Sequence, residues 1–358
     1  MPGNSFISIL MALLLITLIF VLFPSVPTHL VRFINDGFNF STLNPNLTTV
    51  GNLYYPTTTI KENYVPQNAL IAYALSVINK DRLAYNLSAV SYSSIASAQQ
   101  HSENMLQNDY FSHWDIYGMK PYMRYSLLGG NQSVDENIAF IYNSSGVNLT
   151  NAISQMEYDM MYNDSKCCNN GHRDNILTPQ HNYVSIGVAY NATTVYFTED
   201  FINDYINWFY GTPSINNGIV RLNGSYGSNY ALNEVLVTFD PPISSITPFQ
   251  LKHPPYNASY GYGTTIAGIG YTRESGGYRY SYTYGNITTL NATEYVVQGD
   301  NFAVSFNMSN LIRKYGPGEY TIMILLNSTA TNPKSSFLAA THTIFINASG
   351  GSYIPDKV

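Results

Sequence analysis

Two histidines and one glutamate stand out in a chain that is otherwise poor in charge. They are His113, Glu136 and His172, in the local sequences SHW, ENI and GHR. Neutral imidazole nitrogens bind zinc and similar divalent ions, and a carboxylate completes or orients such a shell. Two histidines alone leave open positions for water or a ligand. We therefore predict that these three residues meet in one cleft, where His113 and His172 bind zinc or another divalent metal.

Catalysis would require more than this set of residues. Metal-bound water with Glu136 and His172 as acid and base would suit hydrolysis. The sequence contains no Gly-x-Ser-x-Gly and no His-Glu-x-x-His motif. A pair formed by His172 and one of the nearby cysteines has no local signature. We therefore expect a binding protein rather than an enzyme, with a metal-dependent envelope hydrolase of peptidase type as the alternative.

The only two cysteines, Cys167 and Cys168, are adjacent. They cannot connect distant segments, so the chain is not a disulfide scaffold. A bond between neighbouring cysteines is uncommon, and we expect two reduced or intermolecular thiols in a loop. A zinc pair is less favoured, because the usual two-residue spacer is absent.

The overall composition excludes one class of partner. Charged residues make up 11% of the chain, compared with about 25% in a typical soluble domain. Lysine and arginine total 16 in 358 residues and form no basic run. Nucleic acid is therefore not an expected partner, because phosphate binding needs clustered cations. The hydrophobic content of 45% is high enough for packed cores.

The N-terminal region indicates a location outside the cytoplasm. Residues 6–23 form an uncharged apolar stretch, whose length is near the minimum of about 17 residues for crossing a bilayer. We interpret residues 1–27 as a transmembrane anchor or a signal segment and favour the anchor, because no small-x-small cleavage site follows. Residues 28–66 are interpreted as a linker or stalk. Asn-x-Ser/Thr sequons recur from Asn39 to Asn347, which favours a glycosylated extracellular or cell-surface protein.

The following residues show helical and strand patterns in turn. Apolar spacing predicts helices over residues 68–82, 95–106 and 150–162. Two strands are expected at residues 184–190 and 194–201, with a turn between them. This mixture predicts an α+β or layered fold.

After Trp208 the pattern becomes all-β. Residues 211–217 resemble a Gly/Pro/Asn linker. Strands are predicted at residues 218–222, 233–239, 265–272, 278–284, 302–306, 319–326 and 337–346, with one helical turn at residues 312–314. About seven strands separated by turn residues predict an immunoglobulin-like β-sandwich over residues 217–349.

Residues 67 to about 205 resemble the CAP superfamily of cysteine-rich secretory, antigen 5 and pathogenesis-related (SCP-like) proteins, and most closely its microbial branch. Six motifs occur in the order typical of the family. They are Ala98–Met105, Tyr110–His113, Asp135–Ala139, Gly171–Leu177, Ile186–Ala189 and Phe197–Phe201. The resemblance implies a CAP-type α-β-α sandwich over residues 67–208, followed by the all-β domain.

The resemblance also implies a cleft with two histidines and two acids. By motif match these are His113, His172 and Glu136, with the second acid on the helix before the Gly-His motif. Met156 takes the large apolar position of that helix, which indicates Asp159, while Glu157 is a competitor. Relatives have been linked to lipids, sterols, glycans and protein partners. We therefore expect an amphipathic, glycan or surface-protein ligand with no organic cofactor, and the membrane as a partner through the N-terminal segment.

Overall fold

The computed structural model describes residues 65–211, 213–270, 287–329 and 335–355. The apolar segment at residues 6–23, nearly all of the linker expected at 28–66 and the strand expected at 278–284 lie outside these ranges. Within them, no helix combines the length and the apolar character needed to cross a membrane.

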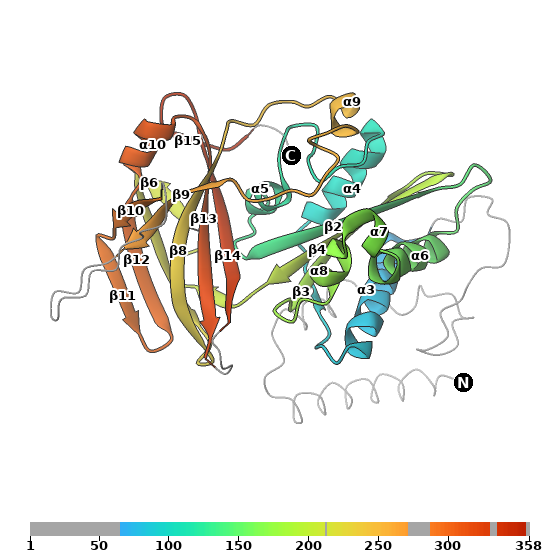
Figure 1. Cartoon of the computed structure of the whole chain (residues 1–358), viewed down its shortest axis with the longest axis horizontal. Helices are drawn as coiled ribbons and strands as arrows, with labels where there is room; N and C mark the ends of the chain where they lie inside the picture. The colour runs from blue at the N-terminus through green and yellow to red at the C-terminus, as the bar shows by residue number, and fades with distance from the viewer. Residues whose placement is uncertain (1–64, 212, 271–286, 330–334, 356–358) are drawn as a thin grey trace, which may run out of the picture. The chain divides into compact units, whose positions relative to one another are not determined.

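The N-terminal part of the described chain is a four-stranded sheet with helices on both faces (Figure 1). The strand order is β1-β3-β4-β2, with β2 and β3 both antiparallel to β4. The strands are β1 (Ser91–Tyr92), β2 (Ser133–Tyr142), β3 (Tyr183–Tyr190) and β4 (Thr194–Asn203). The helices are α3 (Gln67–Ala84), α4 (Ser97–Asn108), α5 (Pro121–Leu127), α6 (Leu149–Tyr162), α7 (Ser165–Cys168) and α8 (Gly171–Ile176).

Burial on both faces of the sheet follows from the sequence of its central strands. The residues of β3 between its two end tyrosines are all buried, as expected for a strand covered on both sides. Helices α3 and α6 share one apolar core with the sheet. Helix α4 packs on β3 so closely that a Cβ at Gly187 would collide with the backbone carbonyl of Ala98. The predicted α-β-α sandwich is confirmed.

The C-terminal part is a β-sandwich with a single core, also as predicted. One sheet has the order β10-β9-β8-β13-β14-β15, and the other has the order β11-β12-β7-β5 with β6 beside β7. The strands are β5 (Ile206–Trp208), β6 (Ser214–Asn216), β7 (Ile219–Tyr226), β8 (Tyr230–Asp240), β9 (Thr264–Gly270), β10 (Thr288–Asn291), β11 (Glu294–Gln298), β12 (Asn301–Asn307), β13 (Gly318–Ser328), β14 (Ser336–Ile346) and β15 (Ser352–Tyr353). Helix α10 (Ser309–Tyr315) contains the expected helical turn.

The two parts are in direct contact. Leu338 of β14 accepts hydrogen bonds from Ser133 and Asn203, both at 2.8 Å. In addition, residues 241–263, here called the β8–β9 segment, leave the sandwich and run along the α-β-α part (Figure 1). This segment contains helix α9 (Pro248–Leu251). The two parts that the sequence analysis separates at residues 208–217 therefore contact each other in the structure. The domain boundaries at residues 67, 208, 217 and 349 stay a prediction.

Candidate functional site

One cleft of about 800 Å³ brings together the histidines and the glutamate expected from the sequence. Its walls come from the loop after α4, from strand β2, from helices α7 and α8, and from the β8–β9 segment. The lining residues are Phe111, Ser112, His113, Asp135, Glu136, Asn137, Ile138, Cys167, Cys168, Gly171, His172, Asp174, Asn175, Thr178, Asn257, Ala258, Ser259, Tyr260, Gly261 and Tyr262.

His113 is held by Glu136 at the floor of the cleft. Its Nδ1 lies 2.8 Å from the Oε1 atom of Glu136, and its side chain is 14% exposed. The ring of Tyr260, from the β8–β9 segment, packs against the imidazole with 5.0 Å between centroids. The second nitrogen, Nε2, is therefore the one left for a ligand.

Glu136 is itself fixed by a buried arginine that the sequence analysis missed. Arg124 of α5 donates from its NH2 group to Oε2 of Glu136 at 2.6 Å, and both side chains are buried. Its NH1 group donates to the carbonyls of His113 and Met119, each at 2.8 Å. The backbone N–H of Glu136 donates to the Tyr260 hydroxyl at 2.9 Å. Both carboxylate oxygens of Glu136 are thus occupied by hydrogen bonds within the protein.

Burial controls the protonation of this part of the site. It raises the pKa of Glu136 to about 7, although the Arg124 guanidinium opposes the shift. Burial, followed by the charge of Glu136, raises the pKa of the neighbouring Asp200 to about 8. Because Arg124 contacts Glu136, we assign the negative charge to Glu136 and the proton to Asp200. Burial, followed by Arg124, lowers the pKa of His113 to about 3, which keeps this imidazole in the neutral form that binds metals.

His172 is held by a second carboxylate, Asp164, which the sequence analysis also missed. The Nδ1 atom of His172 lies 2.7 Å from Oδ1 of Asp164, and the His172 side chain is 18% exposed. The other oxygen of Asp164 accepts the backbone N–H groups of His172 at 2.9 Å and Arg173 at 3.2 Å. Asp164 therefore satisfies free N–H groups in the first turn of α8 as well as orienting the ring.

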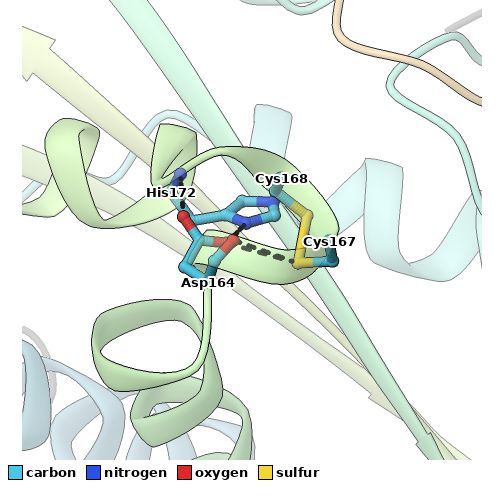
Figure 2. Close-up of side chains that lie close together, drawn as sticks. All are labelled: Asp164, Cys167, Cys168 and His172. Atoms are coloured by element: carbon cyan, nitrogen blue, oxygen red, sulfur yellow. Dashed lines mark hydrogen bonds and ion pairs between the residues drawn. A yellow bond between two sulfur atoms is a disulfide. The ribbon is translucent and has the colours of Figure 1, made fainter.

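The cysteines differ from the expectation of two separate thiols. Cys167 and Cys168 are joined in a disulfide, beside His172 and Asp164 (Figure 2). Adjacent residues bring their Cα atoms to 3.7 Å, and in the short helix α7 the two sulfurs meet. Ligand atoms of these four residues lie within 4.8 Å of one another. Oxidised sulfurs supply no thiolate, so in this form the group does not fit a zinc site.

The remaining candidate acids lie elsewhere. Asp159 is exposed on α6, bonded to Gln155 at 3.1 Å and Asn163 at 2.6 Å, and it is not among the residues that line the cleft. Glu157 is fully buried, and its oxygens have no hydrogen-bond partner among the described residues. Burial and the nearby Glu199 raise the Glu157 pKa well above its usual range. The structure therefore places neither acid beside His113 or His172 in the cleft.

The two imidazoles share one local arrangement. Each has Nδ1 on a buried carboxylate, which fixes the orientation of the ring and leaves Nε2 as the other nitrogen. Within the described part of the chain, neither Nε2 atom has a hydrogen-bond partner. The side chain of Asn137, next to Glu136, donates to the His172 carbonyl at 3.2 Å and ties α8 to β2. Among the described residues, each ring thus presents one unpaired nitrogen, the atom type through which histidine binds zinc.

Comparisons with known proteins identify the family of the N-terminal, α-β-α part of the described chain. Residues 75–201 match the family model of CAP, the cysteine-rich secretory protein family. No curated protein matches the chain. Three solved structures share limited similarity, each over about two fifths of this chain. An extracellular protein with an SCP domain from Bacillus anthracis is 22% identical, with a TM-score of 0.30 over 40% of this chain and 45% of its own.

The other two are more distant in sequence. An outer surface protein from Borrelia burgdorferi is 11% identical, with a TM-score of 0.29 over 39% of this chain and 96% of its own. The CAP domain of enterococcal PrgA is 13% identical, with a TM-score of 0.29 over 39% of this chain and 64% of its own. The chain thus spans less than half of the Bacillus protein that it matches.

Proposed function

Residues 75–201 form a CAP domain, and on that premise we propose that the protein is a cell-surface binding protein. Its cleft binds a divalent ion through the Nε2 atoms of His113 and His172. The observation that carries this proposal is the pairing of each Nδ1 with a buried carboxylate, Glu136 for one and Asp164 for the other. Two such pairs, facing one cleft from segments far apart in sequence, support a metal site more strongly than either histidine does alone.

The rest of the cleft supports an uncharged polar ligand beside the ion. Phe111, Tyr260 and Tyr262 offer aromatic faces, while Asn137 and Asn257 offer amide groups. Aromatic rings stack on the apolar faces of sugars, and amides hydrogen-bond to hydroxyl groups. A glycan is therefore the ligand class that we favour, with an amphipathic lipid as the alternative.

A metal-dependent hydrolase is less well supported. An acid or base for hydrolysis must reach the attacking water. Both oxygens of Glu136 already accept hydrogen bonds, from His113 and Arg124. Glu136 therefore acts as a positioning residue for His113, and we expect no cleavage of casein with or without zinc. Zinc-dependent cleavage that is lost in Glu136→Gln would favour the hydrolase instead.

The proposed location rests on the sequence. The apolar stretch at residues 6–23 and the sequons spread along the chain support membrane attachment or secretion, and glycosylation, outside the cytoplasm. The membrane and a surface glycan, lipid or protein are accordingly the proposed partners.

Calorimetry with zinc in buffer without reductant tests the metal site. We expect one ion per chain for the wild type and no binding for the His113→Ala/His172→Ala double variant. Working without reductant keeps the Cys167–Cys168 disulfide closed. Equal heats for the two proteins would contradict the proposal.

A further inference from the structure

Asp164, Cys167, Cys168 and His172 form a compact group of metal-ligand atoms (Figure 2). The last three also line the cleft. In the structure the sulfurs are oxidised. We propose that reduction of this disulfide creates a thiolate site that binds a thiophilic divalent ion such as Zn²⁺, Cd²⁺ or Co²⁺. The ligands would be the two sulfurs, an imidazole nitrogen of His172 and a carboxylate oxygen of Asp164.

The spacing of the group suits four ligands around one ion. Zinc–sulfur bonds of about 2.3 Å place two thiolates roughly 3.8 Å apart in a tetrahedral site. One ligand atom of each residue already lies within 4.8 Å of the other three. The Sγ of Cys167 is 3.5 Å from Oδ1 of Asp164, and Nδ1 of His172 is 2.7 Å from the same oxygen. Side-chain rotation alone can open the sulfurs to the required separation, because their backbone positions are adjacent.

The backbone holds these residues together without the disulfide. Asn169 and Asn170 both adopt positive φ, at 52° and 64°, and turn the chain between α7 and α8. Asparagine tolerates this conformation better than most residues. Asp164 then accepts the N–H groups of His172 and Arg173 across the turn. Opening the sulfur–sulfur bond therefore leaves Asp164 and His172 in place.

The redox step is an ordinary thiol–disulfide exchange. Cys167 is exposed and Cys168 is half-buried, so a small reductant reaches the bond. Two small thiols supply two electrons and two protons and become a disulfide, while Cys167 and Cys168 become thiols. The ion then binds as two thiolates form, and both thiol protons leave to solvent.

The proposed site shares His172 and Asp164 with the cleft site but uses neither His113 nor Glu136, so the two can be told apart by variants at those positions. The redox conditions around the protein would decide which site is present. The oxidised chain offers only imidazoles with open positions, whereas the reduced chain adds a four-ligand site with two thiolates. Thiolates favour thiophilic ions over magnesium and calcium, which prefer oxygen ligands.

Cobalt titration of the purified full-length protein tests the site, because bound thiolate produces a sulfur-to-cobalt charge-transfer band. A phosphine reductant opens the disulfide, becoming a phosphine oxide with an oxygen from water. We expect the band, saturating at one equivalent for the thiolate site, in the reduced wild type. We expect no band in the oxidised wild type or in Cys167→Ser/Cys168→Ser. Absence of the band in the reduced wild type, or its presence in the double variant, would overturn the proposal.

His113→Ala separates this site from the cleft site, and Asp164→Asn tests the carboxylate ligand. His113→Ala removes a ligand of the cleft ion only, so the reduced variant should retain the charge-transfer band. If His113→Ala abolishes the band, the proposed thiolate site is wrong as described. Asp164→Asn keeps an oxygen at the same position without its charge, and we expect cobalt affinity in the reduced form to fall about tenfold or more. Circular dichroism of each sample confirms that the fold is retained.

Discussion

The two histidines of the cleft share one arrangement but are supported in different ways. His113 rests on Glu136, which rests on Arg124, and all three come from separate elements of the CAP domain. His172 rests on Asp164, only eight residues earlier in the chain. Tyr260 adds a contact to the first pair from more than a hundred residues away.

This difference indicates how each half of the cleft responds to change. The His113 half is built from long-range contacts and buried charge, so its integrity is inseparable from the stability of the fold. The His172 half is a local turn with an exposed disulfide, so it can change its chemistry while the fold stays intact. Substitutions in the first half should therefore affect unfolding, and substitutions in the second should affect ligand binding.

Removing the buried cation should have the largest effect. Arg124→Met leaves the Glu136 carboxylate buried and unpaired, which costs about 3–5 kcal/mol of unfolding free energy. Arg173→Met is the control in the other half, because the Arg173 guanidinium contacts the exposed Tyr85, donating to its hydroxyl at 3.3 Å and lying 5.4 Å from its ring centroid. Its loss should cost less than about 1 kcal/mol. Urea denaturation measures both, and equal losses would remove the contrast between the halves.

Acid should weaken the fold through His113. Its pKa is about 3 in the folded protein and about 6.5 in the unfolded chain. The unfolded state therefore takes up the proton first, and stability is lost as the pH falls from 6.5 towards 3. Relative to His113→Gln, the metal-free wild type should lose about 2.5 kcal/mol between pH 7 and 4.5. Denaturation at both pH values measures the difference, and parallel profiles would contradict it.

Removing the Tyr260 contact, which comes from the β8–β9 segment, should have an intermediate effect on stability. Tyr260→Phe leaves the buried N–H group of Glu136 without its acceptor, at a cost of about 2 kcal/mol. Tyr256→Phe is a matched control from the same segment, because within the described ranges the Tyr256 hydroxyl has no hydrogen-bond partner. Thermal unfolding of the two variants should separate them clearly. Similar melting temperatures would show that Tyr260 only fills space.

The smallest effect on stability should come from Asp164→Asn. Asparagine still accepts the N–H groups of α8, so we expect a loss of less than about 1 kcal/mol. Zinc binding by the oxidised protein should nevertheless weaken about tenfold, because the imidazole loses its carboxylate partner. Calorimetry measures the zinc affinity. An unchanged affinity would show that substitutions in the His172 half do not act mainly on ligand binding.

Much of this arrangement is readable from the sequence, and the exceptions have physical reasons. The α-β-α and sandwich folds follow from apolar periodicity and turn residues. His113, Glu136 and His172 were expected together because they lie in recognisable motifs, and one cleft contains all three. Asp159 was chosen over Glu157 by position on α6, yet its side chain is exposed. Residues two apart face different sides of a helix, yet neither Asp159 nor Glu157 lines the cleft, so position on α6 did not identify an acid of the site.

The supporting residues were harder to find. Asp164 had a usable signal, since Asp is a residue type favoured immediately before a helix, and here it precedes α7. Arg124 had none, because a lone arginine on a short helix is usually a surface residue. Tyr260 could not be found at all, because it is one of 32 tyrosines and its role depends on where a long connection crosses the neighbouring domain.

The path of the β8–β9 segment along the α-β-α part has a practical consequence for work with truncated forms of this protein. The β8–β9 segment supplies part of the cleft wall, although it is encoded after the CAP domain has ended. Expressing residues 67–208 alone would give a wider, wetter groove in which His113 meets bulk solvent. Affinities measured on such a fragment would describe a different binding site from the one in the intact protein.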